Sequence, residues 1–498
     1  MPDEILVSKN LEENIDTIKD ILKDCDDIVY RDFKTGIEQK FSLAVVYTDG
    51  LINKDLISEY VMMPLMVSAR EVEPNPKSFK NNLFELITKG NIAVSEIKEV
   101  DTINEAVEAI LVGETALLID KYDKIVILSS RGWPTRSINE PQTETVIRGP
   151  RDGFTETLKF NTTLIRRRIR DPKLKLKNFQ VGRRSKTDVA LMYIEDIANE
   201  KILNEVKERI QKVDVDAITD SSILEYFIED NYLSPFPQIE NTERPDSVAA
   251  SLYEGRIAIV VDNSPFVLVV PATMGSLLQS SEDYYSRWPI ASIARLVRYI
   301  SALVAVLAPS LYVAITSFHP GLLPTQLAYY VAASRANVPF PAIIEAFLME
   351  ITIELLREAG TRISGPIGTT IGIVGGLIIG QAAVDAGIVS PLMIIIVAVT
   401  TIASFGLPSY EFASGLRFYR FLIMIFSAIV GLYGVVLGLI LMLTQLAKLT
   451  SFGVPFTTPY SGLGIKEGEL KDVVVRVPIQ WMRRRPAFTM PKDKKRMK

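Results

Sequence analysis

The chain has 498 residues and a net charge of −4, and its hydrophobic and charged shares, 48% and 23%, lie near the average of globular proteins. A single cysteine, Cys25, excludes an intrachain disulfide framework. A single histidine, His319, argues against a histidine-based metal site and against a Ser–His or Cys–His catalytic pair.

The averages hide a division of the chain into two regions. Roughly the first 285 residues are rich in charged side chains and roughly the next 160 are nearly uncharged, which is typical of a soluble region fused to a membrane domain. The stretch Met1–Asp16 is acidic and polar, without the basic start and apolar core of a cleavable signal peptide. We therefore expect the N-terminal region to stay in the cytoplasm.

Helix and strand patterns follow one another in the first part of the soluble region. Thr102 and Glu105 form the capping-box pattern that begins a helix, and Gly113 marks its end. Taken along the chain, the patterns predict helices over 11–25, 54–66, 81–88 and 102–113, and buried strands over 41–48, 115–119 and 124–128.

The same pattern returns later in the chain. ETALLIDKYDKIVIL aligns with RIAIVVDNSPFVLVV when Gly113 is placed on Gly255. LAVVYTDGLINKDLISEYV aligns with VALMYIEDIANEKILNEVK when Leu43 is placed on Val189, which is nearly the same shift along the sequence. Two blocks in the same order predict an internal duplication, with chance similarity between apolar strands as the alternative.

The duplication and the change in composition predict the fold class. We expect an α/β cytoplasmic region of two similar subdomains, followed by an α-helical multi-span membrane domain. The predicted parts are an N-terminal helix or tail over 1–30, subdomain 1 over 31–135, a linker over 136–154, subdomain 2 over 155–286, a transmembrane helical domain over 287–447 and a basic cytoplasmic tail over 448–498.

A cluster of arginines closes a helix predicted over 155–169. Its members are Arg166, Arg167, Arg168 and Arg170. One interpretation is a solvated or ion-paired helix end, which suits the negative pole of the helix. The other is a contact with anionic lipid headgroups or with a neighbouring subunit. Nucleic acid is not an expected partner, because no aromatic platform or wider basic surface accompanies the cluster.

The soluble region lacks the common catalytic signatures. It has no phosphate loop of the GxxxxGK[ST] type, no HExxH and no GxSxG. Asp120 and Asp262 each follow a strand and precede a turn, a position where aspartate is common for structural reasons. Two lobes and a linker can still form a ligand cleft. We expect no enzyme activity, no cofactor and no metal ion.

Five apolar or partly apolar segments follow residue 286, over about 299–318, 341–356, 364–390, 391–405 and 421–446. Arg287, Arg295 and Arg298 precede the first segment and place that end in the cytoplasm. The basic tail is expected on the same side, which requires an even number of crossings and favours four over five. Arg417 and Arg420 then lie on the unexpected side, so the sequence leaves the number of crossings open.

The second segment carries carboxylates at a depth where charges are costly. Glu345, Glu350 and Glu354 each cost about 2.5–3.5 kcal/mol at the centre of a membrane helix. One hypothesis is therefore a helix that lines an ion path, and the other is an amphipathic helix that lies at the membrane surface.

The third segment holds glycines at every fourth position, Gly368, Gly372, Gly376 and Gly380. This spacing places them on one stripe of a helix, where small residues let a neighbouring helix approach closely. The stripe predicts tight helix packing in the membrane, within the bundle or between copies of the chain.

Several long motifs resemble one known family. VIRGPRDGFTETLKFNTTLIRRRIRDPKLK, SPFPQIENTERPDSVAASLYEGRIAIVVDNSPFVLVVPAT and RISGPIGTTIGIVGGLIIGQAAVDAGIVSPLMIIIVA are similar to stretches of the A subunit of GerA-type spore germinant receptors. The resemblance extends over about residues 40–485. It implies a multi-pass protein of the spore inner membrane, with its soluble region in the cytoplasm or spore core.

The resemblance also implies partners and a function. A permease-like B subunit and a lipoprotein C subunit are the expected partners, together with membrane lipid and further copies of the chain. Nutrients sensed by the complex are expected to trigger cation release and germination, with this subunit forming or gating a cation channel. The alternatives are a sister-branch protein acting with dipicolinic-acid release proteins, and a secondary transporter, although the membrane part shows no inverted repeat.

Overall fold

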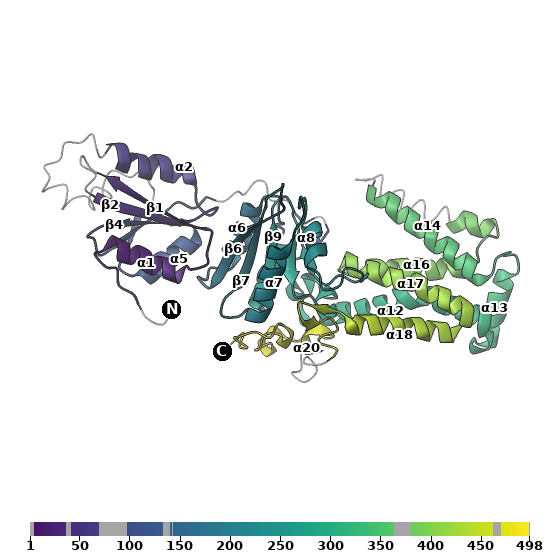
Figure 1. Ribbon diagram of the computed structural model, residues 1–498. Helices are drawn as coiled ribbons and strands as arrows, with labels where there is room; N and C mark the ends of the chain where they lie inside the picture. The colour runs from purple at the N-terminus through teal and green to yellow at the C-terminus, as the bar shows by residue number, and fades with distance from the viewer. Residues whose placement is uncertain are drawn as a thin grey trace. The chain divides into compact units, whose positions relative to one another are not determined.

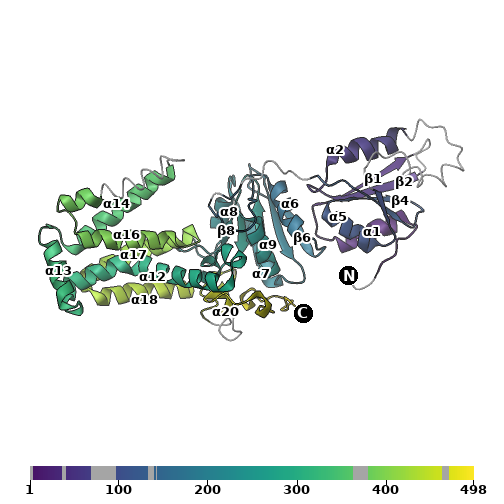
Figure 2. The ribbon, with the colours of Figure 1, turned by 180° about the vertical axis from the view of Figure 1, so that it is seen from behind.

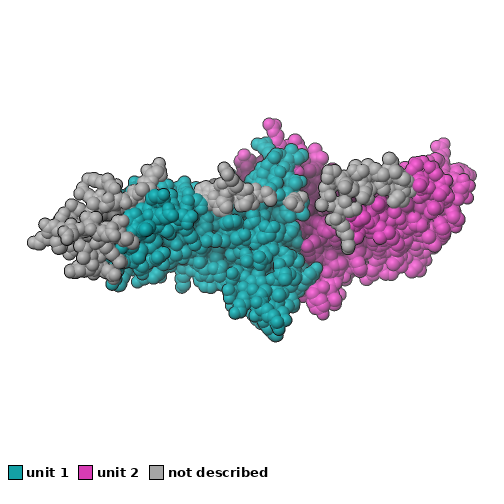
Figure 3. Space-filling model, turned by 90° about the horizontal axis from the view of Figure 1, so that it is seen from above, with its two compact units in different colours: residues 1–229, 239–271, 483–498 teal, residues 230–238, 272–482 magenta. Residues whose placement is uncertain are grey.

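A computed structural model describes residues 4–35, 41–68, 97–132, 140–141, 143–362, 380–461 and 470–497. The chain forms two compact units (Figure 3). Unit 1 comprises residues 1–229, 239–271 and 483–498, and unit 2 comprises residues 230–238 and 272–482. The chain therefore passes between the units four times, and a short segment of the predicted soluble region belongs to unit 2.

The first half of unit 1 is an antiparallel five-stranded sheet in the order β1-β2-β4-β5-β3. Figure 1 shows α1 and α5 on one face of this sheet and α2 on the other. Its elements are α1 (Leu11–Ile21), β1 (Ile28–Thr35), β2 (Phe41–Thr48), α2 (Lys54–Ile57), the π-helical turns η1 (Ser58–Met62) and η2 (Pro64–Ser68), β3 (Ile97–Val100), α5 (Ile103–Val112), β4 (Thr115–Ile119) and β5 (Ile125–Leu128).

The second half of unit 1 is another antiparallel five-stranded sheet, in the order β6-β7-β9-β10-β8. Helices α6 and α9 share a buried core on one face, and α9 stands in front of the sheet in Figure 2. The elements are α6 (Leu158–Arg168), β6 (Leu174–Val181), β7 (Thr187–Ile194), α7 (Glu200–Lys212), α8 (Ser221–Ile228), β8 (Glu240–Thr242), α9 (Pro245–Tyr253), β9 (Ile257–Val261) and β10 (Val267–Val270).

The predicted internal repeat is confirmed by the register of the strands. Leu43 pairs with Ile119 in the first sheet, and the equivalent Val189 pairs with Val261 in the second. The outer strands β1 and β6, which the sequence analysis missed, are related by the same shift along the sequence as Leu43 and Val189. Each half is therefore an α/β subdomain of the same topology, and α1 belongs to the core of the first one, before its predicted start at residue 31.

The two repeated glycines end their helices in the same way. Gly113 (φ +97°) follows α5 and Gly255 (φ +90°) follows α9, and both adopt the left-handed conformation that a side chain disfavours. A Cβ on Gly113 would also lie 3.0 Å from the carbonyl oxygen of Leu51, and one on Gly255 would lie 3.2 Å from Ile197 Cγ2.

Replacing Gly113 or Gly255 with alanine is expected to lower the free energy of unfolding by about 1–3 kcal/mol, because each site combines a positive φ with close neighbours. Thermal unfolding of the purified full chain, followed by circular dichroism, measures this change. Gly360→Ala is the control, since a Cβ there meets nothing within 4 Å. Equal midpoints for all three variants would contradict the assignment.

Local capping explains where two helices begin. The Thr102 hydroxyl accepts a hydrogen bond from Glu105 N, as the capping pattern predicted for α5. The helix predicted over 155–169 begins later than expected, because α6 starts at Leu158 after the N-cap residue Thr157. Leu158 N donates instead to Asp262 Oδ1 at 3.0 Å, so an aspartate from the turn after β9 caps this helix.

Unit 2 is built from helices. Figure 1 shows α12, α16, α17 and α18 side by side, with α14 next to them. The elements are α10 (Met274–Leu277), α11 (Glu282–Tyr285), α12 (Trp288–Phe318), η3 (Pro320–Leu322), α13 (Thr325–Arg335), α14 (Ala342–Arg362), α16 (Pro391–Phe405), α17 (Tyr410–Val430), α18 (Leu432–Lys448), β11 (Thr450–Ser451), β12 (Val454–Pro455), α20 (Leu470–Val473) and η4 (Ile479–Trp481). Unit 1 additionally contains η5 (Ala487–Thr489).

The prediction of one helix over 421–446 was wrong, because the chain turns back at Gly431. This residue has φ +63° and separates α17 from α18, which pack against each other. A Cβ on Gly438 would lie 2.7 Å from Ile423 Cγ1, and one on Gly434 would collide with the backbone of Phe426. The pair Gly434 and Gly438 is a GxxxG motif that the sequence analysis overlooked.

Two helices in the described part of the chain, α12 and α17, are long and apolar enough to cross a membrane. Two shorter apolar helices, α16 and α18, accompany them. Helix α12 continues through Pro309. Predicted helix 81–88 and most of the segment 364–390 lie outside the described residues.

Candidate functional site

The most unusual group in unit 2 is a buried ion pair between two helices. Glu350 on α14 and Arg420 on α17 are 0% and 1% exposed, and Glu350 Oε2 lies 2.8 Å from Arg420 Nη2. Glu350 Oε1 and the Nε and Nη1 atoms of Arg420 have no hydrogen-bond partner within the described ranges. A buried pair with incomplete hydrogen bonding does not recover the full cost of removing two charges from water.

Glu354 lies one turn further along α14 and joins the same group. One of its carboxylate oxygens, Oε1, lies 3.0 Å from Arg357 Nη1 and 3.2 Å from Arg420 Nη2, and 3.9 Å from the Nε of Arg417. Its side chain is 31% exposed. The group therefore holds two carboxylates and three guanidinium groups where α14 meets α17.

Glu345 forms a separate buried contact towards the start of α14. Its Oε1 accepts hydrogen bonds from the backbone N–H of Ser390, at 2.7 Å, and from the Ser390 hydroxyl. The Nε of Arg335 lies 3.5 Å from Glu345 Oε2. Because Ser390 caps α16, this carboxylate ties the start of one helix to another.

The structure thus places all three predicted glutamates on α14 and gives each an arginine neighbour. No sequence pattern predicted these arginine partners. The charge at Arg417 and Arg420, which seemed misplaced in the sequence, lies beside carboxylates on the facing helix.

Three of the four predicted glycines, Gly368, Gly372 and Gly376, lie outside the described residues. Gly380 is buried, and a Cβ there would lie 3.7 Å from Ile394 Cγ2 of α16, an ordinary contact. Tight packing at the glycine stripe therefore stays a prediction, whereas Gly434 and Gly438 occupy a close helix contact.

The predicted arginine cluster divides into a buried and an exposed part. Arg166 is 1% exposed and lies in unit 1, where its Nε and Nη2 donate to the two carboxylate oxygens of Asp27 at 2.9 and 2.7 Å. Its Nη1 donates to the carbonyl oxygen of Leu174. Arg166 is thus not available to lipid, because it joins the first subdomain to the second.

The remaining three arginines lie nearer the surface. Arg168 pairs with Asp152 at 2.7 Å, Arg167 is half-buried and Arg170 is exposed. A lipid or subunit contact of Arg167, Arg168 and Arg170 stays a prediction.

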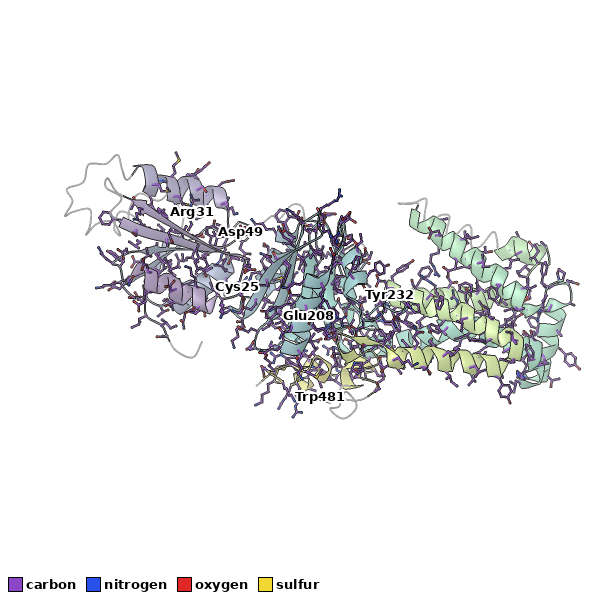
Figure 4. All side chains as sticks on the ribbon, in the orientation of Figure 1. Cys25, Arg31, Asp49, Glu208, Tyr232 and Trp481 are labelled. Atoms are coloured by element: carbon purple, nitrogen blue, oxygen red, sulfur yellow. The ribbon has the colours of Figure 1, made fainter. Side chains whose placement is uncertain are left out.

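Cys25 lies beside Arg166, where the two subdomains of unit 1 meet, and is labelled in Figure 4. Its Sγ lies 3.5 Å from the carbonyl oxygen of Leu174. Burial raises the pKa of the thiol, an effect that the nearby Arg166 only partly offsets. The thiol is therefore protonated at neutral pH and is a packing group, not a reactive thiolate.

A cavity of about 460 Å³ is lined by Gly50, Lys54 and Lys159 among others. Asp49, labelled in Figure 4, precedes Gly50 and binds both lysines. The ammonium groups of Lys54 and Lys159 lie 2.9 and 2.7 Å from Asp49 Oδ1. Burial alone would raise the pKa of Asp49, but the two lysines lower it below its usual range.

Two of the arginines before the first membrane segment, Arg295 and Arg298, share the carboxylate of Asp283, and Arg295 also pairs with Asp472 at 3.3 Å. The carboxylate of Asp283 on α11 accepts hydrogen bonds from Arg295 Nε at 2.9 Å and from both Nη groups of Arg298 at 2.7 Å. Burial favours the neutral acid, yet the two arginines lower the pKa of Asp283. The start of α12 is thus fixed by an ionised carboxylate that the sequence analysis missed.

The described residues contain no group of three or more His, Cys, Asp or Glu side chains that could hold a metal ion.

Comparison with known proteins assigns the chain to a family. The family model of the Bacillus/Clostridium GerA spore germination proteins matches residues 16–488. Spore germination protein A1 of Bacillus subtilis (strain 168) is 46% identical over 77% of this chain and 80% of its own length. Spore germination protein GerLA of Bacillus cereus is 42% identical over 97% of this chain and 96% of its own length.

A further protein and one crystal structure are also similar to this chain. The uncharacterized membrane protein YfkQ of Bacillus subtilis (strain 168) is 42% identical over 96% of this chain and 91% of its own length. The crystal structure of the N-terminal domain of the A subunit of the Bacillus megaterium spore germinant receptor GerK3 is 32% identical, with a TM-score of 0.42, over 55% of this chain and 98% of that domain. The chain belongs to the GerA family of spore germination proteins.

Proposed function

We propose that this chain is the A-type membrane subunit of a nutrient germinant receptor and that it forms or gates a cation path. Its family and its relatives, which are named spore germination proteins, support the first part. The proposal includes a multi-pass location in the spore inner membrane, with unit 1 in the cytoplasm or spore core. It also includes assembly with further copies of the chain, a permease-like B subunit and a lipoprotein C subunit.

The observation that supports a cation path is the fully buried Glu350 on α14. Ionisable residues inside membrane helices are costly, and they commonly mark ion pathways. In this conformation Arg420 neutralises Glu350 and shares Glu354, so neither carboxylate is offered to a cation. We take this as the closed state, in which α14 is held against α17.

Opening then consists of separating α14 from α17. Separation removes Arg420 from Glu350 and leaves the Glu350 carboxylate to attract a cation, while Glu354 keeps its pair with Arg357 on the same helix. Glu345 lies in the first turn of the same helix and acts as its fixed point, because Ser390 donates two hydrogen bonds to its carboxylate. The proposal thus gives the three glutamates different roles.

Glu350→Gln is expected to reduce nutrient-triggered cation release by at least about tenfold, because the carboxylate offered to the cation is lost. The measurement is potassium release from spores that carry the variant, normalised to the amount of receptor in the membrane. Glu358→Gln is the matched control, since Glu358 is an exposed glutamate two turns further on the same helix.

Normal release from the Glu350→Gln receptor would remove this residue from the path. Uptake of labelled nutrient by proteoliposomes that hold the receptor would favour a secondary transporter instead. Loss of release in both the Glu350 and Glu358 variants would indicate a general defect of α14.

A further inference from the structure

The repeated subdomains differ in how one groove is filled. In the first subdomain, the segment 130–132, which follows β5, runs back along residues 51–53. Asn53 N donates to the carbonyl oxygen of Ser130 at 2.8 Å, and Gly132 N donates to that of Leu51 at 3.0 Å. The chain thus fills the groove of the first subdomain with its own next residues.

The second subdomain cannot be completed in this way. The residue equivalent to Ser130 is Ala272, which lies after β10 and belongs to unit 2. Its N–H bonds to Ser451 Oγ at 2.9 Å within unit 2. The groove beside Ile197 and Asn199, the equivalents of Leu51 and Asn53, is therefore left for another segment.

That segment is the tail that follows unit 2. Lys492 N donates to the carbonyl oxygen of Ile197 at 3.0 Å, as Gly132 N does to that of Leu51. Asn199 donates to the carbonyl oxygen of Met490 at 3.0 Å through its side-chain Nδ2, whereas its equivalent Asn53 donates to that of Ser130 through its backbone N. The tail thus runs in the same direction as segment 130–132, reproduces one of its two backbone hydrogen bonds and contacts the equivalent asparagine through its side chain.

Side chains hold the tail on both sides of this contact. Thr489 is fully buried, and its hydroxyl donates to the carbonyl oxygen of Glu254 at 2.7 Å. Arg485 Nε donates to the carbonyl oxygen of Tyr253 at 2.8 Å. Lys492 Nζ lies 2.8 Å from Glu200 Oε1, and Pro491 is buried over Gly255, where a Cβ would come within 3.4 Å of it.

The tail has internal order of its own. Arg485 Nη1 pairs with Asp493 at 2.7 Å, and Arg484 and Lys495 form a short antiparallel bridge. These contacts hold the two ends of residues 483–497 together, so the tail is folded back on itself. Its basic residues, which the sequence analysis interpreted as a cytoplasmic tail, include two that bind carbonyl and carboxylate groups of the second subdomain.

We propose that the groove formed by Ile197, Asn199, Tyr253 and Gly255 is a peptide-docking site, and that residues 483–497 of the same chain are its resident ligand. In the first subdomain residues 130–132 fill this place, and in the second the tail contacts the equivalent residues. The contacts between the tail and this groove all lie within unit 1, and the inference does not depend on the cation path.

Hydrogen–deuterium exchange of the full chain in lipid nanodiscs tests the docking. The Lys492 amide is expected to exchange at least about 100-fold more slowly than an exposed amide. Thr489→Val, which keeps the shape and removes the hydroxyl, is expected to speed exchange in both residues 486–493 and the groove by at least about tenfold. Strands β7 and β9 should keep their protection.

Charge reversal supplies a second test with a matched control. Glu200→Lys is expected to speed exchange of the tail, and the double variant Glu200→Lys with Lys492→Glu to restore protection. Glu208→Lys, which changes another exposed glutamate on α7 (Figure 4), should leave the tail protected. An unprotected tail in the unaltered chain, or a groove that ignores Thr489→Val, would overturn the proposal.

A disulfide test identifies which copy supplies the tail. In a Cys25→Ser background, Asn199→Cys and Met490→Cys are expected to cross-link within one chain, leaving its mass unchanged on a non-reducing gel. A band of doubled mass would show that the tail comes from a second copy and would overturn the assignment to the same chain.

Discussion

Arg166→Ala is expected to lower the free energy of unfolding of unit 1 by about 3–5 kcal/mol, one of the two largest effects in this protein. The substitution leaves Asp27 as a nearly buried carboxylate, 11% exposed, without the two hydrogen bonds that now satisfy it. It also removes the donor to the carbonyl oxygen of Leu174 at the junction of the subdomains. A thermal midpoint lower by about 6–20 °C is expected in circular dichroism of the full chain.

Arg170→Ala is the control for this prediction, because Arg170 is exposed on the turn after the same helix. It should change the free energy of unfolding by less than about 0.5 kcal/mol. The paired change Arg166→Met with Asp27→Leu should recover most of the loss, since it removes both charges together. Equal stability of the Arg166 and Arg170 variants would show that the buried pair contributes nothing.

Arg420→Ala is expected to destabilise unit 2 by a similar amount, about 3–5 kcal/mol. Glu350 would then remain completely buried and without the arginine that now pairs with it, while Glu354 would keep Arg357. Heating the purified chain in detergent and following the loss of helix by circular dichroism measures the change. Protease digestion between α14 and α17 should also become faster.

The double variant Arg420→Met with Glu350→Leu separates stability from function. It should unfold near the temperature of the unaltered chain, yet it should fail to release cations if Glu350 belongs to the path. Arg417→Ala is the control on the same helix, because its Nε lies 3.9 Å from Glu354 and Glu350 has another partner. A double variant that releases cations normally would leave the pair with a structural role alone.

The repeated α/β architecture was predictable because it is recorded locally in the sequence. Buried strands such as Phe41–Thr48 and Thr115–Ile119 are apolar runs bounded by turn residues, and their copies recur at nearly constant offsets. The outer strand Ile28–Thr35 was missed because it is partly exposed and carries charges on both sides of Phe33. Its pairing is visible only once β2 supplies a neighbour.

The charged group between α14 and α17 was only half predictable. The periodicity of Glu350 and Glu354 places them on one face of a helix, so the acidic half could be expected. Their partner Arg420 lies far along the chain from Glu350, on another helix, and no local pattern records which residues meet across such a separation. The contact of Arg166 with Asp27 could not be predicted either, because these two residues are also far apart in the sequence.

Two sets of glycines with the same spacing differ in how readily their structural role can be predicted from the sequence. Gly434 and Gly438 have the same spacing as the conspicuous glycines of 368–380, but the continuous apolar run around them suggested a single helix. The decisive residue is Gly431, whose positive φ ends α17 and lets α18 return along it. A single glycine in an apolar run is not enough to predict such a turn.

Docking of residues 483–497 has a consequence for how the protein is made. The tail follows every described helix of unit 2 in the chain, so the ribosome synthesises it after all of them. Until then, the groove beside Ile197 and Gly255 has no occupant from its own chain. The second α/β subdomain therefore reaches its final form only after the helices have been made, which delays completion of the soluble part until the membrane part exists.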